Sequence, residues 1–125
     1  MKLTLRQSEG EIQAAIVAFL ESQGYVVWRC ALGGVLVRSK GRRAMRKNPN
    51  AGFPDLGCVH RHHRGRLIGI EVKRPGEIAD PHQVAWHERL RSEGALVIVA
   101  QSVNDVRLAL EAARLEGDLK IPSAS

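Results

Sequence analysis

Two carboxylates and a lysine occur in surroundings that do not favour charged side chains. Glu71 and Lys73 lie within the otherwise apolar run 67–73. Side chains alternate across a β-strand, so Glu71 and Lys73 are expected to project from the same face. Asp55 begins the preceding expected strand, and antiparallel pairing of the two strands brings it beside Glu71. The sequence therefore predicts two oxygen ligands and one ammonium group within a few ångströms of one another.

This combination suits the metal-dependent hydrolysis of a phosphodiester. Magnesium is typically bound by one or two carboxylates together with water and substrate phosphate. A bound divalent ion lowers the pKa of water and stabilises the leaving oxygen. Lys73 would orient the attacking water or neutralise charge that develops on the phosphate. A Glu-x-Lys pair alone is usually an ordinary charged stripe on a solvent-exposed strand, but Pro54-Asp55 ahead of it makes the combination more specific.

A basic segment adjoins these residues and favours a polyanionic partner. The chain has a formal net charge of +6, and the segment 31–54 contains six basic residues and no acidic one. The other 13 of the 19 basic residues balance the 13 acidic ones, so this segment supplies the whole excess. It is interpreted as a loop that neutralises phosphates, the alternative being a solvated run of charge. Its basic residues are Arg38, Lys40, Arg42, Arg43, Arg46 and Lys47.

The elements that position these residues follow from local patterns. A helix begins at a Ser8–Glu11 capping box and ends at Gly24. Asp80-Pro81 starts a second helix, which ends at Gly94. The other elements are strands over 25–30, 55–60, 66–73 and 95–100, a short strand over 35–37 in an otherwise mobile loop, a turn over 61–65, and a helix over 103–115 with a frayed tail after residue 117.

These elements predict one α/β domain over residues 1–125, with a core at about 8–115. The hairpin implies an antiparallel strand pair and the strand–helix–strand crossover a parallel pair, so the sheet is mixed and flanked by helices in the order αβββαβα. Apolar spacing predicts two further inner faces. They are Val84, Trp86, Leu90 and His87 in the second helix, and Val106, Leu110 and Ala113 in the last.

Several residues that often carry chemistry are assigned structural roles. Cys30 and Cys58 are expected to be small core residues, because free cysteines are usually buried. His60, His62 and His63 are interpreted as a polar hairpin tip that touches phosphate rather than as a metal site. Trp28 and Trp86 are predicted in the core. With 4% aromatic residues there is little on which single-stranded bases could stack, so duplex or junction DNA is favoured.

The sequence resembles the PD-(D/E)xK nuclease superfamily and, within it, the VRR-NUC family. The resemblance covers about residues 8–105 and is strongest at Gly-Phe-Pro-Asp-Leu (52–56), Ile-Glu-Val-Lys (70–73), and Gln83 to Trp86 followed by Gly94-Ala95. It implies a restriction-endonuclease-like core and Mg²⁺- or Mn²⁺-dependent phosphodiester hydrolysis, often on branched or junction DNA. Stand-alone members of this size occur in phage and bacteria and are similar to dimeric Holliday junction resolvases.

The resemblance also implies roles for individual residues. Asp55 and Glu71 would ligate the metal together with the main-chain carbonyl of Val72, and Lys73 would be the catalytic lysine. Glu11 matches an acidic residue that the superfamily often places on its first helix near the metal, although its capping-box role explains it equally well. Gln83 matches a glutamine at the start of the helix after the site, the alternative being an exposed residue of the first turn.

The expected function is a metal-dependent DNA endonuclease that selects branched or junction DNA. One domain of this size holds one site, so cutting two strands would require a homodimer. A non-catalytic nucleic-acid-binding module is the alternative, and a sequence-specific restriction enzyme is disfavoured because little chain remains to read bases. No apolar run reaches the length of a bilayer span and no signal peptide is recognised, so the expected location is the cytoplasm of a bacterial or phage-infected cell.

Overall fold

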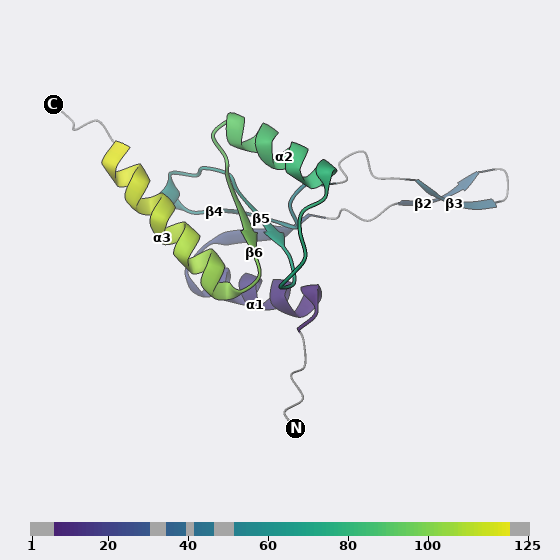
Figure 1. Cartoon of the computed structure of the whole chain (residues 1–125), viewed down its shortest axis with the longest axis horizontal. Coiled ribbons are helices and arrows are strands. Elements are labelled where there is room, and N and C mark those ends of the chain that lie inside the picture. The colour runs from purple at the N-terminus through teal and green to yellow at the C-terminus, as the bar shows by residue number, and fades with distance from the viewer. Residues whose placement is uncertain (1–6, 31–34, 40–41, 47–51, 121–125) are drawn as a thin grey trace, which may run out of the picture.

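The computed structural model describes residues 7–30, 35–39, 42–46 and 52–120 (Figure 1). For 35–39, 42–46 and 118–120 it describes the backbone alone. The elements along the chain are α1 (Glu9–Ser22), β1 (Val26–Arg29), β2 (Val35–Ser39), β3 (Arg42–Arg46), β4 (Leu56–Val59), the 3₁₀ helix η1 (Arg61–His63), β5 (Ile68–Val72), α2 (Pro81–Ser92), β6 (Leu96–Ala100) and α3 (Val103–Lys120).

Four strands form the main sheet in the order β1-β4-β5-β6. Strand β4 pairs antiparallel with both β1 and β5, whereas β5 and β6 are parallel and joined through α2. The predicted mixed sheet and the αβββαβα order of its elements are therefore confirmed. The β4–β5 register pairs Leu56 with Ile70 and Gly57 with Gly69, so Asp55 and Glu71 come at the same level of the sheet.

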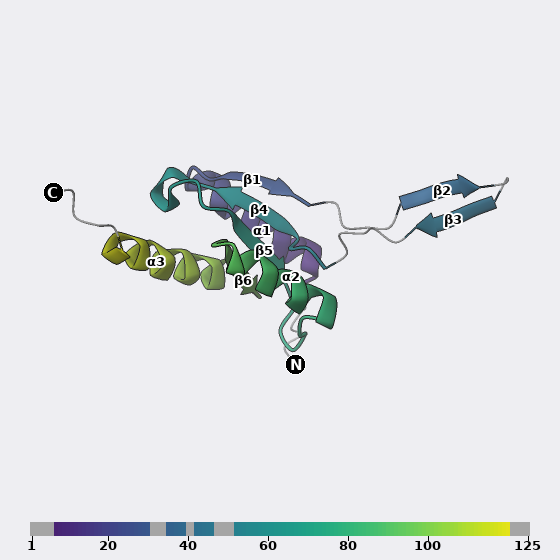
Figure 2. The ribbon, with the colours of Figure 1, turned by 90° about the horizontal axis from the view of Figure 1, so that it is seen from above.

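The basic segment contains more regular structure than expected. The predicted strand over 35–37 is confirmed as part of β2, but β2 pairs antiparallel with a second strand, β3, that was not predicted, and the two form a separate sheet (Figure 2). A hairpin needs only local pairing around a short connection, and basic side chains do not oppose it. Arg38 lies on β2, and Arg42, Arg43 and Arg46 lie on β3. Lys40 and Lys47 lie outside the described residues.

One face of the main sheet carries the apolar core. Ile68, Ile70 and Val72 alternate with Gly69 and Glu71 along β5, and the apolar three join one buried cluster with side chains of β4 and β6. Helix α1 adds Ile12, Ile16 and Leu20 to this cluster, and α3 adds Val106 and Leu110. Each such buried side chain contributes about 1.5–3 kcal/mol relative to an exposed one. The core therefore holds β5 in place from the face opposite Glu71.

The other face of the sheet is shaped by two glycines that pair across β4 and β5. A Cβ on Gly57 would lie 2.4 Å from the Trp28 ring, and one on Gly69 would lie 3.0 Å from the Pro54 ring. The absence of side chains at 57 and 69 thus allows both rings to lie directly on the sheet. Trp28 remains 41% exposed above Gly57, so its predicted place in the core was wrong.

Helix α2 covers the β5–β6 part of this same face, and its inner side differs from the prediction. His87 is the buried residue at 3% exposure, whereas Val84 is 42% exposed. Trp86 is half-buried, packs edge-on against Phe53 with ring centroids 5.3 Å apart, and lies under the Arg89 guanidinium. Apolarity was a poor guide here because the sheet surface that faces α2 contains the polar Glu71.

Helix α3 extends to Lys120, five residues beyond the predicted end, so the expected frayed tail after residue 117 was wrong for 118–120. Its predicted inner residues Val106, Leu110 and Ala113 are buried. Both cysteines are free; Cys58 is buried as expected and Cys30 is half-buried. No helix in the described part of the chain is long and apolar enough to cross a membrane.

Candidate active site

Asp55 is held at the point where the β4–β5 ladder ends. Its Oδ2 accepts a hydrogen bond of 2.8 Å from the backbone N–H of Val72, and its own carbonyl accepts one of 2.9 Å from Cys30 N–H. The Asp55 carboxylate thus binds the Val72 N–H group of β5, which the backbone of a longer β4 would otherwise bind. In an antiparallel pair, the N–H and C=O of one residue face the same neighbour, so the Val72 carbonyl is directed to the Asp55 side as well.

Glu71 is 1% exposed, on a strand buried along its whole length. Burial raises its pKa to about 9, and a hydrogen bond with Asp55 and repulsion from the Asp55 charge act in the same direction, while Lys73 opposes them. The predicted proximity of Asp55 and Glu71 is therefore confirmed. An ordinary charged stripe on a solvent-exposed strand face is excluded, since such a side chain would be hydrated.

His87 is a part of the site that the sequence indicated only as an inner-face position. Its Nε2 lies 3.7 Å from Glu71 Oε1, and neither atom has a hydrogen-bond partner among the described residues. Burial lowers the His87 pKa, with Arg91 and Lys73 contributing. Since the Glu71 pKa is raised and the His87 pKa is lowered, this contact joins two neutral groups near neutral pH rather than an ion pair.

Lys73 follows the last residue of β5 and is half-buried. Its positive charge partly opposes the rise in the pKa of Glu71 and of Glu9. Glu9 itself has a raised pKa, caused first by desolvation and then by the negative charges of Glu77 and Asp55. Of the acidic residues in the first turn of α1, Glu9 is therefore the one whose charge interacts with Asp55, Glu71 and Lys73.

Glu11, which the sequence suggested for this role, makes the capping box of α1. Ser8 Oγ accepts from Glu11 N–H at 3.1 Å, and the Glu11 carboxylate accepts from the Ser8 hydroxyl at 3.2 Å. Among the described residues no contact links Glu11 to Asp55 or Glu71. Glu9 and Glu11 both lie in the first turn of the same helix, and the sequence offered no signal that favoured Glu9.

Gln83 makes the equivalent capping box of α2. Its Oε1 accepts from Asp80 N–H at 2.9 Å, and its own N–H donates to Asp80 Oδ1 at 2.9 Å. Gly52, with φ of +96°, lies against this helix start, where a Cβ would be 2.7 Å from the His82 carbonyl carbon. Gln83 therefore helps to place the segment that leads into Asp55, and a direct catalytic role for it stays a prediction.

The donor set fits a magnesium-type cation with open coordination positions. Within the described residues no group of three or more His, Cys, Asp or Glu side chains is arranged to hold a metal. A closed structural metal cage is therefore not what these residues form. Two neighbouring carboxyl groups, one with a buried oxygen that lacks a partner, match the one or two carboxylates that Mg²⁺ commonly uses.

The buried Glu71 carboxyl group should make the stability of the metal-free protein depend on pH. In the unfolded chain Glu71 has a pKa near 4.5, and in the folded chain the pKa is about 9. The folded state thus keeps its proton where the unfolded state loses it, and stability falls as the pH rises between these two values. Glu71→Gln should flatten this slope.

Urea unfolding in EDTA at about pH 6 and about pH 8 measures the effect for both proteins. Equal losses of unfolding free energy in the wild type and in Glu71→Gln would contradict the assignment of the proton to Glu71.

Glu9 and Glu11 offer a matched pair of substitutions on one helix. Glu9→Gln removes a negative charge that acts on Asp55 and Glu71, so Mn²⁺ affinity should fall about three- to tenfold. Glu11→Gln keeps a capping-box residue but removes a negative charge from the N-terminal end of α1, so it should lower the melting temperature slightly and leave Mn²⁺ affinity unchanged. Titration calorimetry with Mn²⁺ distinguishes the two, and a larger loss of affinity in Glu11→Gln would reverse the assignment.

Comparison with known proteins places this geometry in a family. The VRR-NUC domain family matches residues 7–104. A solved structure described as a VRR_NUC domain is similar with a TM-score of 0.59 and 31% identity, over 82% of this chain and 94% of that one. A second, described as a VRR_NUC domain protein, shares the fold with a TM-score of 0.54 and 22% identity, over 86% and 88% of the two chains. No match was found among the curated proteins. The chain therefore belongs to the VRR-NUC family of nuclease-type domains.

Proposed function

We propose that this protein is a metal-dependent endonuclease that hydrolyses phosphodiester bonds in DNA and prefers branched or junction DNA. The observation that carries the proposal is the pair of carboxyl groups of Asp55 and Glu71. They lie side by side, and the pKa of Glu71 is raised to about 9 because the group is buried beside another acid. A surface that only bound DNA would gain nothing from two carboxyl groups next to phosphate.

Each residue has a distinct task in the proposed reaction. Asp55, Glu71 and the Val72 carbonyl hold Mg²⁺ or Mn²⁺, which supplies an activated water and stabilises the leaving oxygen when bound. Lys73 carries an ammonium that offsets the negative charge developing on the scissile phosphate. Asp55 keeps its orientation through the 2.8 Å bond from Val72 N–H, so this oxygen cannot rotate away freely.

The basic residues of β2 and β3 are proposed to hold the DNA near the site. Their role rests on charge, because the segment 31–54 contains no acidic residue. Duplex or junction backbone is favoured over single-stranded DNA, since the chain has only two tryptophans, one tyrosine and two phenylalanines on which bases could stack.

Cleavage of a panel of four-way, flapped and linear DNA tests the proposed activity. Mg²⁺ or Mn²⁺ should support cleavage and EDTA should stop it. Asp55→Asn and Lys73→Ala should each lower the rate by about 10²–10³-fold, because each removes a charge from the reacting phosphate or its metal. Glu88→Gln is the matched control, since Glu88 is an exposed carboxylate on α2.

Full activity in Asp55→Asn would reject the site, and cleavage that resists EDTA would reject the metal. Binding to DNA without cleavage of any member of the panel would favour the alternative, a non-catalytic nucleic-acid-binding module with this fold.

We further propose that the enzyme acts as a homodimer, because one domain carries one site and paired cuts need two. Size-exclusion chromatography with light scattering should give twice the 13.8 kDa of the chain. A mass of one chain at the concentrations used for cleavage would contradict the dimer.

A further inference from the structure

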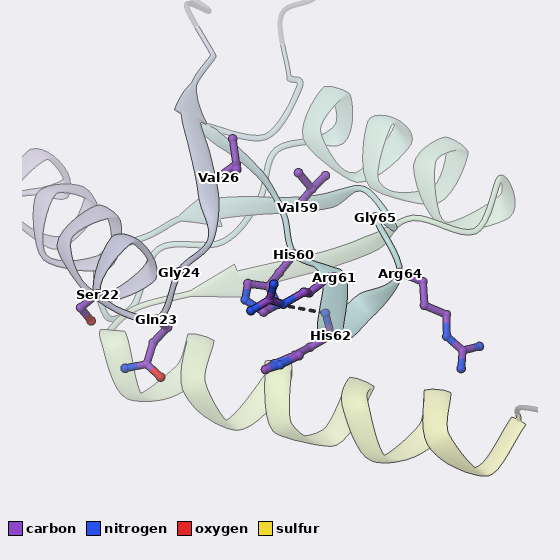
Figure 3. A pocket seen from close by; sticks show the side chains of 10 residues that line it. All are labelled: Ser22, Gln23, Gly24, Val26, Val59, His60, Arg61, His62, Arg64 and Gly65. Atoms are coloured by element: carbon purple, nitrogen blue, oxygen red, sulfur yellow. Dashed lines mark hydrogen bonds between the residues drawn. The ribbon is translucent and has the colours of Figure 1, made fainter.

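A second basic surface lies at the end of the main sheet opposite to Asp55 and Glu71. There η1 and the residues after it join β4 to β5, and they contact α3. Three adjoining hollows of about 870, 210 and 270 Å³ surround this turn and share His62 as a lining residue. Figure 3 shows the largest, with His60, Arg61 and His62 gathered on one side of the turn and Arg64 on the other.

The lining of these hollows is strongly positive. It contains five arginines, at positions 61, 64, 66, 107 and 114, and one acidic residue, Glu111. Glu111 is already engaged with Arg107 at 3.2 Å. Arg61, Arg64 and Arg114 make no ion pair with any described residue, and these three are named the distal arginines below. Their charges are thus free for an anionic partner.

The neighbouring histidines His60 and His63 have lowered pKa values, to which this positive charge contributes. The pKa of His63 is lowered by burial, then by its neighbours His60 and His62, and also by Arg114 and Arg66. The pKa of His60 is lowered by desolvation and by His62, Arg61 and Arg114. Both histidines are therefore neutral near neutral pH, and the arginines supply the positive potential.

The turn that carries Arg61 and Arg64 is held by specific contacts. His60 Nδ1 accepts a hydrogen bond of 2.9 Å from His62 N–H, and the buried His63 is hydrogen-bonded to the Tyr25 hydroxyl at 2.8 Å. His63 is thus a structural anchor rather than part of an exposed polar tip, which corrects the interpretation drawn from the sequence. Arg64 has φ of +59°, in the left-handed region, and its side chain is exposed.

The distance to the catalytic pair suggests what this surface binds. Glu71 is seven positions after Arg64, so a fully extended chain would cover about 23 Å at about 3.3 Å per residue, and the turn at Arg64 and Gly65 shortens this to roughly 20 Å or less. Each nucleotide of one DNA strand advances about 3.4 Å along the helix axis, so this span corresponds to at most about six nucleotides. We propose that the distal arginines bind backbone phosphates of the same DNA about 20 Å from the bond that is cut. This inference rests on the proposed function in one respect, that DNA is the substrate.

The test compares DNA of two lengths by fluorescence anisotropy, without divalent metal, so that its result does not depend on cleavage. A duplex of about 4 base pairs, closed by a hairpin loop, is about 14 Å long and too short to occupy both surfaces, whereas one of about 30 base pairs reaches both. The variant Arg61→Gln/Arg64→Gly/Arg114→Gln removes the three distal charges. We expect its affinity for the long duplex to fall at least tenfold and its affinity for the short duplex to change less than threefold.

The salt dependence gives a second readout. Each lost phosphate contact lowers the slope of log affinity against log salt by about 0.9, so the slope for the long duplex should fall by about 2–3. Glycine adopts the left-handed conformation without the steric cost that arginine bears, so Arg64→Gly should not lower the melting temperature. If the triple variant melts at the same temperature as the wild type, a loss of its affinity is therefore due to the missing charges and not to misfolding.

Arg107→Gln/Glu111→Gln is the matched control, because it alters the same rim and leaves its net charge unchanged. It should bind the long duplex like the wild type. An unchanged affinity of the triple variant for the long duplex would overturn the proposal, and so would an equal loss on both duplexes, which would indicate a general effect of net charge. A selective loss on the long duplex in a protein that cleaves no DNA would support this surface and reject only the nuclease activity.

Discussion

Asp55 and Glu71 lie side by side in a place from which solvent is largely removed, and such an arrangement of two acids costs free energy. In the metal-free protein the cost is limited by protonation, because the Glu71 pKa is raised to about 9. The backbone prevents the two groups from separating, since Val72 N–H and Cys30 N–H both bind Asp55. The apolar cluster on the opposite face of β5 holds the strand that carries this unfavourable pair.

The central part of this arrangement could be predicted from the sequence because it follows from two short-range rules. Alternation along a strand puts Glu71 and Lys73 on one face, and the antiparallel hairpin puts Asp55 beside them. Helix starts were equally local, since both Ser8 and Asp80 bind the backbone N–H three residues later. Fold class followed from the order of these elements, as the crossover through α2 requires a parallel pair.

The parts that were not predicted depend on contacts between distant segments. His87 was expected on the inner side of α2 and is buried there, but its contact with Glu71 was not predicted, and Val84 of the same predicted face is exposed. Glu9 and Glu11 are two residues apart, and only the direction in which α1 approaches β5 decides which of them senses the site. Strand β3 was missed since its composition, rich in arginine, is also that of a loop.

The pairing of Gly57 with Gly69 restricts how a chain of this fold can vary in length during evolution. A one-residue insertion within β4 would turn Asp55 from the α2 side of the sheet into the apolar core beside α1, because side chains alternate with a period of two. Insertions in the η1 connection are not restricted in this way, provided that the side chains of β4 and β5 stay on the same faces of the sheet. Related domains are therefore expected to differ in the length of this turn and to keep the number of residues between Asp55 and Gly57, and between Gly69 and Glu71, constant.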